Sequence, residues 1–256
     1  MPTQTDHAQA FHRLHVKGEP VVLFNVWDAG TAKVVAEAGA KAIATGSWSV
    51  AAAHGYGDGQ ALPLNVAMDN LVRICASVAL PVTIDLEAGY GDAPEIVADS
   101  VARALAAGAI GFNIEDQIIG GEGLYAIADQ AARIRAARVT ADRAAVPAFI
   151  NARTDIFLKA AAGKHDASMI DLALQRAEAY AASGASGFFV PGLNDETLIA
   201  KLCAKCALPV NIMVMPATPT AVRLAALGVA RISHGPGPYR QMMRALGEAA
   251  RHVYAS

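Results

Sequence analysis

This sequence has few cysteines, few charged side chains and few aromatic ones. Cys75, Cys203 and Cys206 are too few for the disulfide framework of a small secreted domain. Charged residues make up 17% of the chain and aromatic residues 6%, and the formal net charge is only −2. Because there is also no dense run of lysine or arginine, the sequence offers no electrostatic attraction for nucleic acid.

Long apolar runs are missing too. No stretch reaches the roughly 18 apolar residues that span a bilayer, and segment 1–15 lacks the apolar core of a signal peptide. We therefore expect a cytoplasmic protein without a membrane partner. Cys203 and Cys206 form a C-x-x-C pair, but no second ligand pair lies nearby, and we interpret them as ordinary residues of an apolar helix.

What the chain does have is a regular alternation of apolar runs and helix-length segments. Its 256 residues are 54% apolar, which is enough for a large core. The strand-like runs are 21–27, 42–46, 82–87, 111–115, 148–153, 187–191, 210–214 and 231–234. Segments such as 95–107 and 169–183 have the length of helices. Eight such units predict an α/β fold, a single-domain (β/α)8 TIM barrel over residues 1–256.

The way each strand is introduced supports this count. The first, third, fifth and seventh strands follow a proline, and the other four follow a glycine that can end the preceding helix. A two-unit rhythm that runs four times favours a closed barrel over an open sheet with a second domain. At the helix starts, we interpret Asp92, Ser168 and Thr218 as N-terminal signals.

Polar side chains gather at the predicted carboxyl ends of the strands, where barrel enzymes place their active sites. Carboxylates dominate this group, and like charges that converge on one mouth repel each other unless a cation lies among them. Asp85 and Glu87 are two residues apart on one strand and so share a face. Oxygen ligands of this kind are those that Mg2+ prefers.

Other residues predicted at the mouth suit an anionic substrate. Arg153 would present a permanently charged fork to a carboxylate or an enolate oxygen. The turn Thr45-Gly46-Ser47 offers backbone N–H groups to an anion. The glycine-rich segments 55–59 and 120–123 are typical of mobile loops, and the second could close over a substrate.

Six motifs together resemble the isocitrate lyase/phosphoenolpyruvate mutase superfamily, over about residues 24–239. They are T-G-S (45–47), G-Y-G-D (55–58), D-L-E-A-G-Y-G-D (85–92), N-I-E-D (113–116), N-A-R-T-D (151–155) and P-V-N-I-M (209–213). The resemblance implies a (β/α)8 barrel that binds Mg2+, with Mn2+ as an alternative, and an α-keto acid or its enolate. It also implies a homo-oligomer, a dimer or a tetramer, whose subunits exchange the last helix.

The resemblance also implies roles for individual residues. Asp85 would hold the metal directly, and Asp58, Glu87 and Glu115 would organise it partly through water. The turn Thr45, Gly46 and Ser47 would bind the substrate carboxylate. Arg153 would stabilise the enolate, and Asn211 would line the pocket.

The sequence departs from this family in three places. The superfamily's isocitrate and methylisocitrate lyases carry an acidic cysteine in a K-K/R-C-G-H loop, where this chain has Gln117–Gly123. Their glutamate at the end of the sixth strand is replaced by 190–192, Val-Pro-Gly. The lysine that phosphonate-processing members place in the strand-four loop is absent here, and Glu87 stands where a second aspartate is usual.

The remaining groups favour simple chemistry on a small α-keto acid. We predict a Mg2+-dependent lyase that cleaves a C–C bond or decarboxylates an oxaloacetate-like substrate through an enolate. The alternatives are a phosphonopyruvate or phosphoenolpyruvate mutase or hydrolase, a keto-acid-binding barrel without turnover, and a metal-dependent aldolase of another barrel family. Candidate proton donors are His54, Tyr56 and His234.

Overall fold

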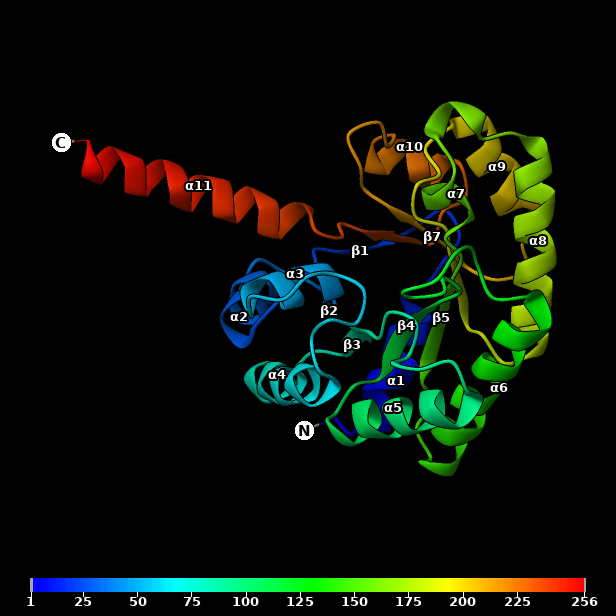
Figure 1. The fold of residues 1–256 in the computed structure, drawn as a ribbon, viewed down its shortest axis with the longest axis horizontal. Helices are drawn as coiled ribbons and strands as arrows, with labels where there is room; N and C mark the ends of the chain where they lie inside the picture. Colours follow the sequence, from blue (N-terminus) through cyan, green and yellow to red (C-terminus); the bar gives the residue numbers. More distant parts are fainter. Residues whose placement is uncertain (1, 256) are drawn as a thin grey trace.

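The computed structural model describes residues 2–255 and contains an eight-stranded parallel β-sheet that closes into a barrel (Figure 1). The strands are short, from two to five residues. Their bounds are β1 (Val21–Leu23), β2 (Ile43–Ala44), β3 (Val82–Asp85), β4 (Gly111–Glu115), β5 (Phe149–Arg153), β6 (Gly187–Phe189), β7 (Val210–Met213) and β8 (Arg231–Ser233).

Hydrogen bonding runs around the barrel in the order β1-β8-β7-β6-β5-β4-β3-β2. A parallel bridge between Val26 and Thr45 joins the two ends of this sheet. There Val26 donates its N–H to the Ala44 carbonyl at 2.9 Å, and Gly46 donates to the Val26 carbonyl at 3.2 Å. The predicted (β/α)8 barrel is therefore confirmed, with its closure just beyond the ends of β1 and β2.

Most helices follow a strand and cover the outside of the barrel, except the first, which precedes β1, and the last, which extends away (Figure 1). Their bounds are α1 (Gln4–Arg13), α2 (Ala29–Glu37), α3 (Ser47–Ala53), α4 (Leu64–Ser77), α5 (Pro94–Ala106), α6 (Ile127–Arg143), α7 (Ile156–Lys159), α8 (Ala167–Ala182), α9 (Glu196–Lys205), α10 (Ala221–Ala226) and α11 (Gly237–Tyr254). A short 3-10 helix spans Ala162–Lys164. None of the helices within residues 2–255 combines the length and the apolar character needed to cross a bilayer.

The predicted glycine rhythm has a clear structural basis. Each glycine that precedes an even-numbered strand has a φ between 88° and 103°, a region that costs other residues conformational energy. The residue after each glycine donates its N–H to a carbonyl five residues back, as Ala109 does to Ala104 at 3.1 Å. This is the hydrogen bond of a Schellman cap. The four glycines are Gly39, Gly108, Gly184 and Gly228.

The predicted helix starts are less accurate. The N-caps are Ala93, Asp166 and Thr220, one or two residues away from Asp92, Ser168 and Thr218. Asp166 accepts hydrogen bonds from the backbone of the following turn, so Ser168 already lies inside α8. Asp92 instead accepts a hydrogen bond from the hydroxyl of Tyr125. The Asp92 carboxylate therefore binds a distant side chain and does not cap α5.

The amino-terminal end of the barrel is filled by aromatic rings. His15, just after α1, stacks on Phe149 at the start of β5 with 3.9 Å between ring centroids. Phe11 of α1 contacts the same phenyl ring edge-on at 5.4 Å. Burial, together with the nearby charge of Arg231, lowers the pKa of His15 to about 3. A neutral imidazole therefore belongs to this packed plug, at the opposite end from the predicted site.

The last helix packs on its own barrel only through its first turn. In Figure 1, α11 extends away from the other elements and ends far from them. Pro238 is the one buried residue that this helix contributes within the described chain. Met242, Met243 and Leu246 of α11 are between 46% and 61% exposed. The structure of this chain alone therefore leaves an apolar helix face uncovered.

Candidate functional site

A cavity of about 280 Å3 opens at the carboxyl end of the barrel. All eight strands, or the residues directly after them, contribute to its wall. From β1 to β8 these contributions are Asn25, Ser47, Asp85, Glu115, Arg153, Phe189, Met213 and Ser233, and further lining residues include Gly46, Asp58, Glu87, Gln117, Ile119 and Arg240. The sequence placed the site at this end of the barrel, and the cavity lies there.

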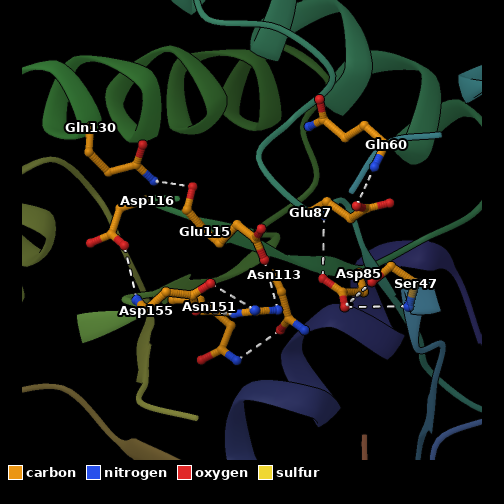
Figure 2. A network of polar contacts seen from close by, with 11 residues as sticks. Ser47, Gln60, Asp85, Glu87, Asn113, Glu115, Asp116, Gln130, Asn151 and Asp155 are labelled. Atoms are coloured by element: carbon orange, nitrogen blue, oxygen red, sulfur yellow. Dashed lines mark hydrogen bonds and ion pairs between the residues drawn. The ribbon is translucent and has the colours of Figure 1, made fainter. Parts of the chain in front are cut away.

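Asp85, the last residue of β3, is held from two sides (Figure 2). One carboxylate oxygen accepts hydrogen bonds from the hydroxyl of Ser47 at 2.9 Å and from its backbone N–H at 3.4 Å. The other accepts from the backbone N–H of Glu87 at 3.4 Å. Thr45 contributes from beneath, because its hydroxyl accepts the N–H of Asp85 at 3.1 Å. The T-G-S turn therefore orients a carboxylate in this structure.

Glu87 adopts an unusual backbone conformation that turns its side chain into the cavity. Its φ is 50°, a value that is uncommon outside glycine and that marks functional sites when neighbours enforce it. Its carboxylate accepts the N–H of Gln60 at 2.6 Å, a contact that ties the strand-three turn to the loop after α3. Burial, together with the charge of Asp85, raises the pKa of Glu87 to about 7.

Arg153, the last residue of β5, is bound by two carboxylates. Its Nε and Nη2 donate to the two oxygens of Asp155 at 2.6 and 2.9 Å, a bidentate pair. Its Nη1 lies 2.7 Å from Oε2 of Glu115 on β4. Burial alone would lower the pKa of Arg153, but Glu115 and Asp155 raise it well above its ordinary value. Of the five N–H donors of a guanidinium, two remain for a ligand.

Asp58, Glu87 and Glu115 share a raised pKa. In each case burial is the first cause, and the charges of neighbouring carboxylates add to it. Lining one cavity with these side chains and Asp85 costs electrostatic free energy that a bound cation would remove. This is an indication of a cation site, since like charges are rarely gathered without a compensating one.

The carboxylates that line the cavity fit Mg2+ better than structural zinc. Within residues 2–255, no three His, Cys, Asp or Glu side chains are close enough to form a ready-made metal cage. Such a cage would be expected for structural zinc. Mg2+ keeps several waters and needs only one or two protein carboxylates. Asp85 and its neighbours Asp58 and Glu87 on an open cavity therefore fit Mg2+ or Mn2+, and Glu115 lines the same cavity with one of its two oxygens paired to Arg153.

A second arginine lies inside the barrel, below the cavity. Arg231 of β8 is 1% exposed, and no carboxylate of the described chain lies within ion-pair distance of it. Its guanidinium donates to Ser233 at 3.2 Å and to Asn113 at 3.4 Å. Burial lowers the pKa of Arg231 to about 9, and Asp85 opposes that fall. This buried charge was not singled out from the sequence, because an arginine inside a strand normally faces solvent.

Some predicted site residues do not reach the cavity wall. Asn211 lies deeper in the barrel, where its amide donates to Ser233 at 3.1 Å. Thr45 also lies beneath the cavity, as described above. The three candidate proton donors, His54, Tyr56 and His234, are absent from the wall. The His234 ring instead packs against Phe24 at 5.1 Å, and His54 hydrogen-bonds to its own helix.

Two glycine-containing loops meet over the mouth. Gly59 and Ile119 both line the cavity, and a methyl group added to Gly59 would lie 3.7 Å from Ile119 Cγ2. An antiparallel bridge between Gln117 and Leu124 closes the base of the second loop. This loop contributes an amide and an apolar side chain to the cavity, with no Lys, Cys or His. Glu122, the one carboxylate of this loop, is exposed and does not line the cavity.

Two lining residues on the other side were missed by sequence reasoning. Trp48 directly follows Ser47, and Arg240 belongs to the first turn of α11. The Arg240 guanidinium carbon lies 4.5 Å from the centre of a Trp48 ring. No motif joined these positions, which are nearly 200 residues apart in sequence. Only the closure of the barrel between β1, β2 and β8 brings them together.

Comparison with known proteins gives consistent results. The family model named phosphoenolpyruvate phosphomutase matches residues 11–254. A crystal structure from Burkholderia cenocepacia, provisionally described as a phosphonomutase, is 52% identical with a TM-score of 0.96, and the alignment covers 98% of this chain and 100% of that one.

Two curated relatives carry different activities in their names. The 2-methylisocitrate lyase of Escherichia coli is 29% identical, covering 96% of this chain and 82% of the relative. The oxaloacetate decarboxylase of Chromohalobacter salexigens is 26% identical, covering 98% and 86%. Because the family model spans nearly the whole sequence, this chain belongs to the phosphoenolpyruvate phosphomutase family, within the isocitrate lyase/phosphoenolpyruvate mutase superfamily.

Proposed function

We propose that this protein is a cytoplasmic, Mg2+-dependent lyase that cleaves or decarboxylates a small α-keto acid of the oxaloacetate type. The observation that carries the proposal is that Asp85, Glu87 and Asp58 line one cavity with the ion-paired Arg153, next to a loop, Gln117–Gly123, that has no Lys, Cys or His. The names of the relatives support enzymes of this kind, because they include a lyase and a decarboxylase. The three free cysteines agree with a reducing compartment.

Several residues of the cavity would have separate roles in the proposed reaction. When bound beside Asp85, Mg2+ would withdraw electron density from the keto oxygen of the substrate. Ser47 fixes the orientation of Asp85, and the two remaining N–H groups of Arg153 stabilise negative charge that develops on oxygen. Ile119 and the loop around it exclude water from the cavity. Decarboxylation breaks the bond between the carbon beside the ketone and its carboxylate, releases CO2 and leaves the electron pair in an enolate, whose carbon then takes a proton from water. The departing CO2 needs no protonation, which agrees with a loop that has no Lys, Cys or His.

One observation favours a second candidate function. The crystal structure with 52% identity is described, provisionally, as a phosphonomutase. A phosphonopyruvate or phosphoenolpyruvate mutase or hydrolase would use the same metal and keto-acid groups, but the lysine that such enzymes place in the strand-four loop is absent from Gln117–Gly123. We therefore keep C–P bond chemistry as the alternative. The remaining alternative is a barrel that binds keto acids without turning them over.

Thermal unfolding with oxalate, a mimic of enolpyruvate, tests the binding part of the proposal. We expect a rise in Tm that requires oxalate and Mg2+ together, since a ligand that binds only the folded state stabilises it. No rise at saturating concentrations would refute the site. Product analysis with oxaloacetate, and phosphorus NMR with phosphonopyruvate, then separate the lyase from the mutase or hydrolase. Binding without any product would support the non-catalytic alternative.

We also propose that the chain forms a homo-oligomer, a dimer or a tetramer, through α11. The support is the uncovered apolar face formed by Met242, Met243 and Leu246, on a helix that extends away from its own barrel (Figure 1). Exposed apolar surface of this extent is expected to be buried against a partner. The barrel of a second copy would provide such a partner if the helices are exchanged.

A further inference from the structure

An arginine without a counterion lies inside the barrel, below the cavity. Arg231 of β8 is 1% exposed, and no carboxylate of the described chain forms an ion pair with it. Its Nη1 has no hydrogen-bond partner among residues 2–255. A buried charge without a partner lowers the stability of a folded protein, because the hydration that it loses is not replaced. Arg231 therefore weakens the folded state unless something bound to the protein compensates its charge.

Only one layer of polar side chains separates Arg231 from the cavity. Its Nε donates to Ser233 Oγ at 3.2 Å and its Nη2 to Asn113 Oδ1 at 3.4 Å, and both of these residues line the cavity. On the opposite side, its guanidinium carbon lies 5.9 Å from the centre of the Phe11 ring in the aromatic plug. The charge therefore faces the cavity through polar groups, whereas an apolar ring lies behind it.

The contacts of Arg231 also fix the orientation of Asn113. The side-chain oxygen of Asn113 accepts from Arg231 and, at 2.9 Å, from the amide of Asn151 (Figure 2). Because this oxygen is bound from two sides, the N–H2 group of the same amide is left for the cavity that Asn113 lines. The floor of the cavity therefore presents an N–H donor, backed by a positive charge, to the oxygen of a ligand.

A buried cation acts in opposite directions on the two kinds of ligand that this cavity suits. Four carboxylates that attract a divalent cation line the cavity, those of Asp58, Asp85, Glu87 and Glu115. Burial lowers the pKa of Arg231 and the Asp85 charge opposes that fall, so these two side chains act on each other. Charges separated from water interact over several ångströms. Arg231 therefore attracts an anion and repels a cation that binds beside Asp85.

We propose that Arg231 is a positioning and specificity residue, whose buried charge strengthens the binding of an anionic ligand at the cavity floor and weakens the binding of a metal ion without that ligand. The metal and the anion then bind best together, because the anion compensates Arg231 and the metal compensates the carboxylates. The inference rests on the proposed function, which identifies the anion as a keto acid or its enolate and the cation as Mg2+ or Mn2+. Arg231 acts through Asn113 and Ser233.

Two variants with neutral side chains test this charge in the full-length protein. Arg231→Met removes the charge and the donors, and Arg231→Gln removes the charge but keeps an N–H2 group. In both variants Asn151 can still donate to Asn113. Asn211 can still donate to Ser233, so neither acceptor loses its last donor. We therefore expect both variants to fold, and Arg231→Met to have a higher Tm than the original protein because an uncompensated buried charge is gone.

The two affinities are measured separately. Electron paramagnetic resonance of free Mn2+ gives the Kd for the metal alone, and isothermal titration calorimetry at saturating Mg2+ gives the Kd for oxalate. We expect both Arg231 variants to bind Mn2+ roughly threefold more tightly and oxalate roughly fivefold more weakly than the original protein. Changes of opposite sign distinguish an electrostatic role from damage to the site, which would weaken the binding of both ligands.

Arg138→Met is the matched control. Arg138 of α6 is also partly buried, and its guanidinium donates to the carbonyls of Gly184 and Ala148. It does not line the cavity or contact the residues beneath it that bind Arg231. The control variant therefore removes an arginine charge elsewhere in the same barrel, and we expect it to leave the Kd values for Mn2+ and oxalate unchanged.

The outcomes separate the two levels of inference. If Mn2+ and oxalate do not bind the unmodified protein, the proposed function and the role of Arg231 fail together. If they bind and neither Arg231 variant changes the two affinities, the proposed function stands and the role of Arg231 is refuted. Weaker binding of both ligands, or a lower Tm with unchanged affinities, would make Arg231 a structural residue and overturn the inference. Arg231→Gln behaving like the original protein would assign the effect to hydrogen bonding and refute a role of the charge.

Discussion

Nη1 of Arg153 lies 2.7 Å from Oε2 of Glu115, across a register pair of the neighbouring strands β5 and β4. Glu115 is 5% exposed, so this ion pair is nearly dry and correspondingly rigid. The family resemblance implied that Glu115 helps to organise the metal partly through water, and the structure adds an ion pair between Glu115 and the Arg153 guanidinium. We infer that Glu115 serves the cavity chiefly by fixing Arg153, and that Asp85 has the main metal-binding role.

Replacing Asp85 with alanine should abolish the combined effect of Mg2+ and oxalate on Tm. Asp85 is the carboxylate that Ser47 and the Glu87 backbone hold in place, and alanine has no oxygen to bind a cation there. Differential scanning fluorimetry checks this, with Asp69→Ala on the exposed face of α4 as the control. A variant that kept the full Mg2+-dependent shift would contradict the metal assignment.

The stability of the metal-free protein should fall as pH rises from about 4.5 to 7. The pKa of Glu87 is about 7 in the folded state against an ordinary value of 4.5, so the folded state binds more protons than the unfolded state in this window. By linkage, the free energy of unfolding then decreases with rising pH. Urea titrations at several pH values measure this slope, and Glu87→Gln should flatten it.

With Mg2+ present, the free energy of unfolding should no longer decrease as pH rises. A cation binds the ionised carboxylate, so its affinity rises as pH increases through about 7, the region where Glu87 loses its proton. Titrating Mg2+ at pH 5.5 and at pH 8 compares the two states. Equal affinities at both values would show that Glu87 does not take part in cation binding.

Asp155→Asn should lower both stability and turnover. Asp155 is fully buried, and its two oxygens bind Nε and Nη2 of Arg153. Removing one partner of a buried ion pair typically costs about 3 kcal/mol or more of unfolding free energy. Because Arg153 would be less fixed, we expect kcat for the accepted keto acid to fall more than KM rises. A loss of stability with unchanged kcat would restrict Asp155 to a structural role.

Gly192→Ala should destabilise the protein by about 2 kcal/mol or more. Gly192 has a φ of 92°, and an added Cβ would lie 2.9 Å from the backbone carbon of Phe157, where nothing flexible can move aside. Gly57→Ala is the control, since its φ is not positive and no atom lies within 4 Å of the added group. Guanidinium denaturation of the two variants should give clearly different midpoints.

Leu246→Glu should disrupt the proposed oligomer. Leu246 is 61% exposed on the apolar face of α11, so a charge there costs nothing in an isolated chain but opposes burial against a partner. Light scattering after size-exclusion chromatography measures the mass of both proteins. The same mass for the variant and the original protein would place the oligomer contact elsewhere or exclude it.

Much of the architecture could be predicted from local signals. The end of α5 is an example, because Gly108 with its positive φ and the hydrogen bond from Ala109 to Ala104 lie within a few consecutive residues. The placement of the carboxylates at the mouth follows equally from strand order, because the ends of all parallel strands meet there. The predicted strands 21–27 and 187–191 were too long, since β1 and β6 end once the backbone turns toward the site.

The contacts across the barrel could not be predicted in the same way. The ion pair of Arg153 with Glu115 depends on the register of two strands, and the stacking of Arg240 on Trp48 depends on closure of the whole barrel. The Asp92 carboxylate accepts from Tyr125 instead of capping a helix, because a partner 33 residues away competes with the local one. Pairwise tertiary geometry of this kind leaves no periodic trace in one sequence.

The position of α11 has a practical consequence for measuring this enzyme. In its first turn, Arg240 forms part of the cavity wall and Tyr239 packs against Trp48, while the rest of the helix extends away from the barrel (Figure 1). If a second copy holds the far end, dilution releases that end and loosens the wall at the same time. Activity per chain would then decline in very dilute assays and recover when the protein is concentrated.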